Sequence, residues 1–186
     1  SIDNKLIPSV FQSKAESLNN MGYVYQNMNR HDKALIYFKD ALKQENLKAD
    51  KPGLYAMVID NLAYSKFKTG DFDGLPKEFF KSLKIRDSLQ LTSGSIVSKM
   101  RLSEYFAFKK DPSKSLKFAK EALNESLSSK NYRSVLLALK RLSVIEPQKA
   151  AFYTKEYIRI NDSLQVTERK MGDKFTRIEY ETDQIK

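Results

Sequence analysis

The chain has 186 residues, of which 41% are hydrophobic and 30% are charged, and it contains no cysteine. This composition is typical of a folded domain, and it excludes disulfides, thiolate catalysis and cysteine-based zinc sites. No run approaches the roughly 18 apolar residues that span a bilayer. The net charge of +10 could attract nucleic acid, anionic lipid or an acidic partner, but interleaved acidic residues favour simple solvation of helix surfaces. Because the chain does not open on Met, we expect it to be a segment of a longer protein.

Residues 15–48 carry the clearest pattern. Small or apolar residues recur at i, i+3, i+4 and i+7, the spacing of one helix face, at Leu18, Met21, Gly22 and Tyr25. After the polar turn 29–32, a second helix carries Ala34, Phe38 and Ala41 at i, i+4 and i+7. Small residues at Gly22, Ala34 and Ala41 predict that two antiparallel helices approach closely there.

The same arrangement recurs along the chain. A step of twelve residues from the first helix to the second relates Gly22 to Ala34, Ala63 to Leu75, Ser103 to Ser115 and Ala138 to Ala150. We therefore predict four helical pairs, at about residues 15–48, 56–89, 96–129 and 131–164. No segment alternates with period two, so no sheet is expected.

Breaker residues divide these pairs. All five prolines fall at predicted helix starts, and Asp111 before Pro112 is a typical helix cap. We expect Pro52-Gly53 to separate the first pair from the second, and Ser93-Gly94-Ser95 to separate the second from the third.

Residues 15–48 resemble the tetratricopeptide repeat (TPR), whose pattern is W-x2-L-G-x2-Y, then A-x3-F, then P. Gly22, Tyr25, Ala34 and Phe38 match, while Leu18, Met21 and Asn46 replace the Trp, Leu and Pro. The resemblance implies an all-α, right-handed solenoid of about four helical hairpins, occupying residues 1–156. A long helix, residues 157–186, would follow it.

In TPR proteins the first helices of successive pairs line a concave groove that binds a protein or peptide. The resemblance implies that residues on these helices line the groove and contact the partner: Asn19, Asn20, Tyr23, Asn27, Asp60, Asn61, Tyr64, Lys68, Arg101 and Glu104. Asn offers a donor and an acceptor, and Tyr an apolar body with a polar tip. The alternative is that these are ordinary solvated surface residues. The basic clamp with which some TPR proteins hold a C-terminal carboxylate is not reproduced, because Asn19 and Tyr23 occupy two of its positions.

No pattern points to catalysis, a metal site or a cofactor. His31 is the only histidine, and we interpret it as a packing residue because no second His or Cys could share a metal. No HExxH motif, phosphate-binding loop or nucleophile elbow occurs. We therefore expect a non-catalytic binding protein.

The last helix carries an apolar stripe with a seven-residue period: Tyr157, Leu164, Met171, Ile178 and Ile185. Such a stripe indicates either a cap packed on the preceding helices or the seam of a homodimer. Residues 157–164 and 175–183 also resemble the end of the sensor domain of bacterial TPR-containing membrane regulators. That resemblance implies a periplasmic sensor connected to a histidine-kinase or helix-turn-helix effector. A soluble cytoplasmic TPR scaffold is the alternative, and direct nucleic-acid binding is not expected.

Overall fold

The computed structural model describes the backbone of residues 7–183 and the side chains of residues 14–170. Within this range the regular structure is all helical and contains no strand, which confirms the predicted all-α class. The elements in chain order are α1 (Ile7–Asn27), α2 (His31–Leu42), α3 (Leu47–Asp50), α4 (Pro52–Thr69), α5 (Lys77–Ser88), α6 (Thr92–Phe108), α7 (Pro112–Ser128), α8 (Tyr132–Ile145), the 3-10 turn η1 (Pro147–Lys149) and α9 (Ala150–Asp183).

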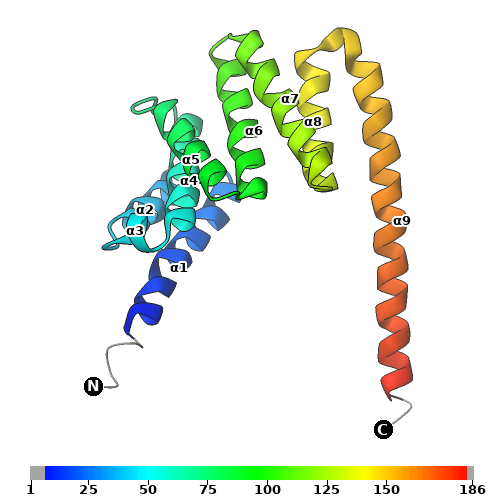
Figure 1. Ribbon diagram of the computed structural model, residues 1–186, viewed down its shortest axis with the longest axis horizontal. Coiled ribbons are helices and arrows are strands. Elements are labelled where there is room, and N and C mark those ends of the chain that lie inside the picture. The colour runs from blue at the N-terminus through cyan, green and yellow to red at the C-terminus, as the bar shows by residue number, and fades with distance from the viewer. Residues whose placement is uncertain (1–6, 184–186) are drawn as a thin grey trace.

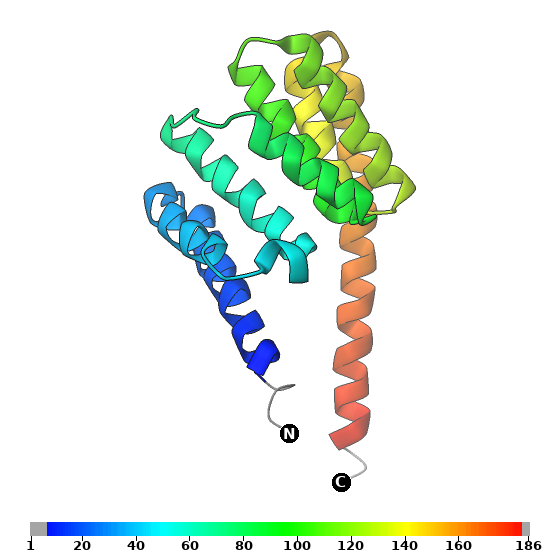
Figure 2. The ribbon, with the colours of Figure 1, turned by 60° about the vertical axis from the view of Figure 1, so that its left-hand side comes forward.

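Four helical pairs stack side by side into an arched solenoid (Figures 1 and 2). The pairs are α1 with α2, α4 with α5, α6 with α7, and α8 with the first part of α9. This is the predicted TPR-like arrangement of about four hairpins with a long last helix. The arch places α1 and α9 at its two ends, with the middle pairs between them (Figure 1).

Helix α7 begins where local chemistry favours a start. The Asp111 side chain accepts a hydrogen bond from the Lys114 backbone N–H at 3.0 Å, and Pro112 occupies the first helical turn of α7, as predicted. Ser93-Gly94-Ser95 does not separate two pairs, because these residues lie in the first turn of α6. The connection is instead at 89–91, where Gln90 adopts a left-handed conformation with φ of 55°.

The first pair packs at the predicted small residues. A Cβ atom on Gly22 would lie only 2.5 Å from Cε1 of Phe38, so the Phe38 ring sits directly against the α1 backbone. Ala34, Phe38 and Ala41 are all fully buried. A side chain at position 22 would therefore have to displace the ring that holds α2 onto α1.

The core is shared between neighbouring pairs. One cluster joins α2 to α4, a second joins α4, α5, α6 and α7, and a third joins α7, α8 and α9. The clusters are Ala34, Phe38, Ala41, Val58 and Leu62; then Ala63, Phe67, Phe79, Leu83, Leu102, Tyr105, Phe106 and Phe118; then Ala119, Val135, Leu139, Leu142, Tyr153 and Ile160. No pair buries its apolar face alone, which is the physical basis of a solenoid.

Among the residues whose side chains the structure describes, the last helix packs on the solenoid through its first part, up to Leu164. Tyr153 and Ile160 are buried against α8, with Tyr157 and Leu164 half-buried beside them. Residues 165–170 are exposed. Of the predicted apolar stripe, Met171, Ile178 and Ile185 lie outside the residues whose side chains the structure describes. Whether that part of the stripe forms a dimer seam stays a prediction.

The Gly22–Phe38 contact predicts a severe effect of Gly22→Leu. Forcing a branched side chain into this contact should lower the free energy of unfolding by about 1–3 kcal/mol or more. Asn20→Leu is the matched control, because it places the same side chain on the exposed face of α1. Thermal unfolding followed by circular dichroism measures both. Equal melting temperatures for the two variants would contradict the proposed helix packing.

Candidate binding groove

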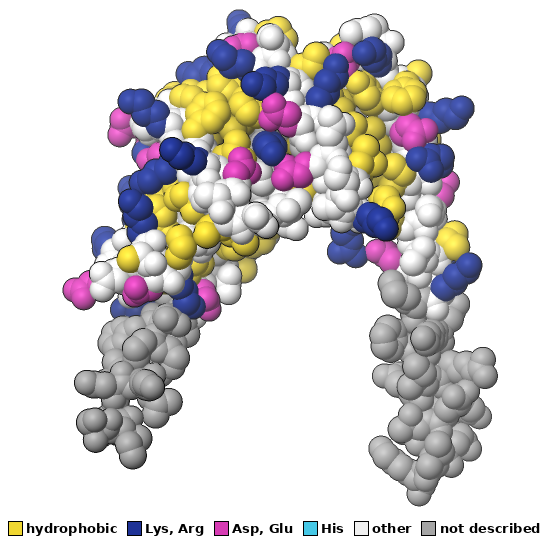
Figure 3. Space-filling view, viewed as in Figure 1, with side chains coloured by type: hydrophobic (Ala, Val, Ile, Leu, Met, Phe, Trp, Pro, Cys, Tyr) yellow, Lys and Arg dark blue, Asp and Glu magenta, His cyan; other side chains and the backbone are white. Residues whose placement is uncertain are grey.

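The first helices of the four pairs line one groove on the inner side of the arch. Its cavity has a volume of about 650 Å³. The lining residues come from α1, α4, α6 and α8, from the turn between α1 and α2, and from the first residue of α2: Tyr23, Gln26, Asn27, Asn29, His31, Tyr64, Ile96, Val97, Met100, Arg101, Glu104, Ser134, Leu137, Lys140, Arg141 and Val144. Figure 3 shows the molecule hollowed between the two ends of the solenoid.

The structure divides the ten predicted groove residues into three groups. Tyr23, Asn27, Tyr64, Arg101 and Glu104 line the cavity. Lys68 lies beside it, bound to Glu104, whereas Asn20 is exposed on α1 outside the lining. The remaining three, Asn19, Asp60 and Asn61, are buried beneath the groove, with exposed fractions of 3%, 0% and 4%. Their expected place on the groove surface is wrong, because Asn19 and Asn61 bond to each other between α1 and α4, and Asp60 bonds to residues of α5 and α6.

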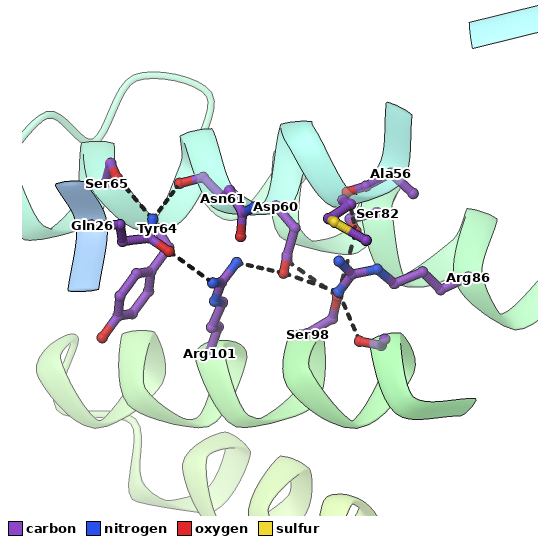
Figure 4. Close-up of polar contacts among 12 residues, drawn as sticks. Gln26, Ala56, Asp60, Asn61, Tyr64, Ser65, Ser82, Arg86, Ser98 and Arg101 are labelled. Atoms are coloured by element: carbon purple, nitrogen blue, oxygen red, sulfur yellow. Dashed lines mark hydrogen bonds and ion pairs between the residues drawn. The ribbon is translucent and has the colours of Figure 1, made fainter. Parts of the chain in front are cut away.

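The centre of the buried layer is the carboxylate of Asp60 on α4. Arg86 from α5 donates to Oδ2 of Asp60 at 3.0 Å, and Arg101 from α6 donates to the same oxygen at 2.7 Å. Ser98 donates to the other oxygen at 3.1 Å. A fully buried carboxylate requires this degree of compensation, since removing its charge from water is costly. Asp60 therefore holds three helices at fixed positions (Figure 4).

Arg86 is itself largely buried, and its hydrogen bonds are made through Nη1. Its Nη1 also donates to the backbone oxygen of Gly94 at 2.7 Å and contacts Ser98 Oγ at 2.8 Å. Burial lowers the pKa of Arg86, while Asp60 opposes that shift. Two arginines against one aspartate leave the cluster with an excess positive charge.

Gln26 on α1 extends this network to the first pair. Its Nε2 donates to the backbone oxygen of Asn61 at 2.9 Å and to Ser65 Oγ at 2.8 Å. Its Oε1 accepts from Nη2 of Arg101 at 3.1 Å. Arg101 thus bridges Asp60 and Gln26, and Figure 4 shows its side chain lying between them. Nearby, Asn61 donates to Asn19 at 3.0 Å, a second link from α4 to α1.

The groove surface above Arg101 is aromatic and charged. The guanidinium of Arg101 lies 4.7 Å from the centre of the Tyr64 ring, which is a cation–π contact. The Tyr64 hydroxyl donates to Glu104 at 3.3 Å, and burial raises the pKa of Tyr64, reinforced by Glu104. Glu104 also pairs with Lys68 at 2.9 Å and Arg141 at 3.2 Å. The hydrogen bond to Glu104 raises the pKa of Lys68.

Several lining residues were not anticipated from the sequence. On α8 these are Leu137, Lys140, Arg141 and Val144, which recur at i, i+3, i+4 and i+7 and so share one helix face. That spacing could have identified a shared face in the sequence. The more apolar stripe of Val135, Leu139 and Leu142, on the neighbouring face of α8, is the more prominent pattern and marks the buried face instead. Gln26, one turn after Gly22, could have been found in the same way.

His31 begins α2 at the edge of the groove and is almost fully buried. Its Nδ1 lies 3.4 Å from Ser65 Oγ, and its ring meets the Tyr64 ring edge-on with centroids 6.0 Å apart. Burial lowers the pKa of His31 from its usual 6.5, and the positive charge of Lys68 lowers it further. Both effects favour the neutral form of His31.

Two properties of the described residues bear on the class of site. Within residues 14–170, no three His, Cys, Asp or Glu side chains are grouped as a metal ion would require. None of the helices in the described part of the chain combines the length and apolar character needed to cross a bilayer.

The tetratricopeptide repeat family model matches residues 15–46. No curated protein matches the chain. The family match, together with the all-helical stack of hairpins, supports a TPR protein and a protein–protein interaction module.

The buried His31 predicts an acid-sensitive component of stability. Because its folded-state pKa lies below 6.5, its contribution is complete above pH 6.5 and is lost as the pH falls through the folded-state pKa. Urea unfolding between about pH 7.5 and pH 5.5 should therefore show a smaller loss of stability in His31→Gln than in the wild type. Identical pH slopes in the two proteins would contradict the burial of a neutral imidazole.

Proposed function

We propose that this protein binds a protein or peptide segment in the groove formed by α1, α4, α6 and α8. The observation that carries the proposal is the cavity itself, which exposes large apolar side chains among polar ones. Val97, Leu137 and Val144 are 40%, 61% and 72% exposed although they line a concavity. Exposed apolar side chains rimmed by polar groups are typical of interaction sites.

The network beneath the groove favours binding without rearrangement. Arg101 and Tyr64 are fixed by Asp60, Gln26 and Glu104, so the polar surface is formed before a partner arrives. A preorganised surface loses less conformational entropy on binding. The groove can therefore act as a rigid template for a flexible segment.

We propose that the function is non-catalytic. The one Ser–His contact at the groove joins His31 to Ser65, but Ser65 is fully buried and its hydroxyl also accepts a hydrogen bond from Gln26. Ser65 is thus a structural hydroxyl that a substrate cannot reach. A nucleophile must be both accessible and activated by its base.

We further propose that the domain is the sensor part of a membrane-anchored bacterial regulator, on the periplasmic side of the inner membrane. The support is α9, a helix of 34 residues whose first part packs on the solenoid and whose residues 165–170 are exposed. Such a helix could carry a binding signal to an effector, or pair with a second copy to form a homodimer.

The alternative is a soluble cytoplasmic scaffold for protein assembly. A coding sequence with about 20 apolar residues soon after Lys186 would favour the sensor, and hydrophilic sequence there would favour the scaffold.

The binding proposal predicts the outcome of selecting peptides from an unbiased displayed library. Leu137→Gln, in the groove, should weaken binding of the selected peptides about tenfold, because an apolar contact is lost. Leu127→Gln is the matched control, since Leu127 is similarly exposed on α7 but does not line the groove. Affinity is measured by fluorescence anisotropy. Selected peptides that bind both variants with wild-type affinity would contradict the groove as the site.

A further inference from the structure

The charges around the groove are unbalanced. Among its lining residues Arg101, Lys140 and Arg141 are cations, whereas Glu104 is the only carboxylate. The buried Asp60 does not correct this balance, because Arg86 already pairs with it in addition to Arg101. A cavity with low-dielectric walls and an excess of one charge attracts ligands of the opposite charge.

Glu104 alone does not balance the excess of positive charge around the groove. It accepts from Tyr64 and pairs with both Lys68 and Arg141, so one carboxylate is shared by two cations. Lys140 is exposed and has no carboxylate of residues 14–170 within ion-pair distance. The basic character of the groove is therefore concentrated at Lys140 and Arg141.

The two cations share a face of α8 with apolar side chains. Leu137, one turn before Arg141, and Val144, one turn after Lys140, are the most exposed apolar residues of the lining. On α6, Val97 adds a further exposed apolar side chain to the cavity. The surface thus presents positive charge flanked by apolar area, rather than a continuous row of cations.

We propose that the partner segment is acidic and amphipathic, with Asp or Glu side chains bound to Lys140 and Arg141 and neighbouring apolar side chains lying on Leu137, Val144 and Val97. This inference rests on the proposed function and names the chemistry of its ligand. The apolar neighbours and Glu104 disfavour a nucleic acid, whose backbone is bound by several cations that follow its phosphates. Nucleic acid is nevertheless included as a competing ligand in the test.

The direct test compares three peptides that share the same leucines and carry Glu, Gln or Lys at the remaining positions. Anisotropy with the wild-type protein should show the Glu peptide binding at least about tenfold more tightly than the Gln peptide, and the Lys peptide most weakly. A Gln peptide equal to the Glu peptide overturns the inference. A short RNA that binds more tightly than the Glu peptide, with a steep salt dependence, also overturns it.

Variants assign the effect to particular cations. Lys140→Gln combined with Arg141→Gln should weaken the Glu peptide about tenfold, the size expected for two partly exposed ion pairs, and should leave the Gln peptide unchanged. Lys39→Gln combined with Lys84→Gln removes the same charge from exposed positions on α2 and α5 and should have no such effect. Equal losses in the two double variants would show a general charge effect and overturn the site.

Glu104→Gln should strengthen the binding of the Glu peptide, whereas the cation substitutions should weaken it. It frees Arg141 and Lys68 from their shared carboxylate, so the Glu peptide should bind about threefold more tightly, which a loss of structure would not produce. Weaker binding overturns the inference. If library-selected peptides bind at Leu137 but are neutral or basic, only the acidic chemistry fails. If none depends on Leu137, the proposed function fails as well.

Discussion

The interaction on which the rest of the structure depends is the buried carboxylate of Asp60. It has no exposed surface, and it is compensated by two arginines and a serine from neighbouring helices. Removing one partner from such a cluster leaves a charge buried without compensation, which typically costs about 3–5 kcal/mol. Stacked hairpins contact only their neighbours. The network adds a directional constraint to that stack, because hydrogen bonds fix α1, α4, α5 and α6 in one relative geometry.

The same network sets the chemistry of the groove. Arg101 donates from one nitrogen to Asp60 and from another to Gln26, and its guanidinium lies 4.7 Å from the centre of the Tyr64 ring. Tyr64 in turn donates to Glu104, which also forms ion pairs with Lys68 of α4 and Arg141 of α8. The buried charge cluster and the exposed binding surface are therefore parts of one chain of contacts. A change at Asp60 should reach the groove through Arg101.

Local features of the fold could be read from the sequence, and long-range features could not. Gly22, Ala34 and Phe38 revealed their packing because helix spacing and side-chain size are local properties. The cap at Asp111 is local as well. Asn61 and Asp60 were assigned to the correct helix and to its inner side, but their depth depends on how closely α6 covers α4. The Gln26–Arg101 contact joins residues 75 positions apart, and no local pattern records it.

The groove was predicted in part for the same reason. Tyr23, Tyr64 and Arg101 were found because equivalent positions in successive pairs share a face. The basic face of α8 was missed since the fourth pair departs furthest from the repeat pattern, with Leu136 and Leu139 at its equivalent positions. Leu139 is in fact a core residue. The neighbouring face of α8, which carries Leu137, Lys140, Arg141 and Val144, lines the cavity instead.

The measurement that tests this account most directly is native-state hydrogen exchange of Asp60→Asn beside Asp50→Asn. The first substitution keeps the shape of the side chain but removes the buried charge, whereas Asp50 is exposed on α3. The account predicts that Asp60→Asn lowers the opening free energy of α1, α4, α5 and α6 together, by about 3–5 kcal/mol, while Asp50→Asn changes it little. Loss of protection in α5 alone, or equal effects of the two substitutions, would contradict a network that joins the first three pairs.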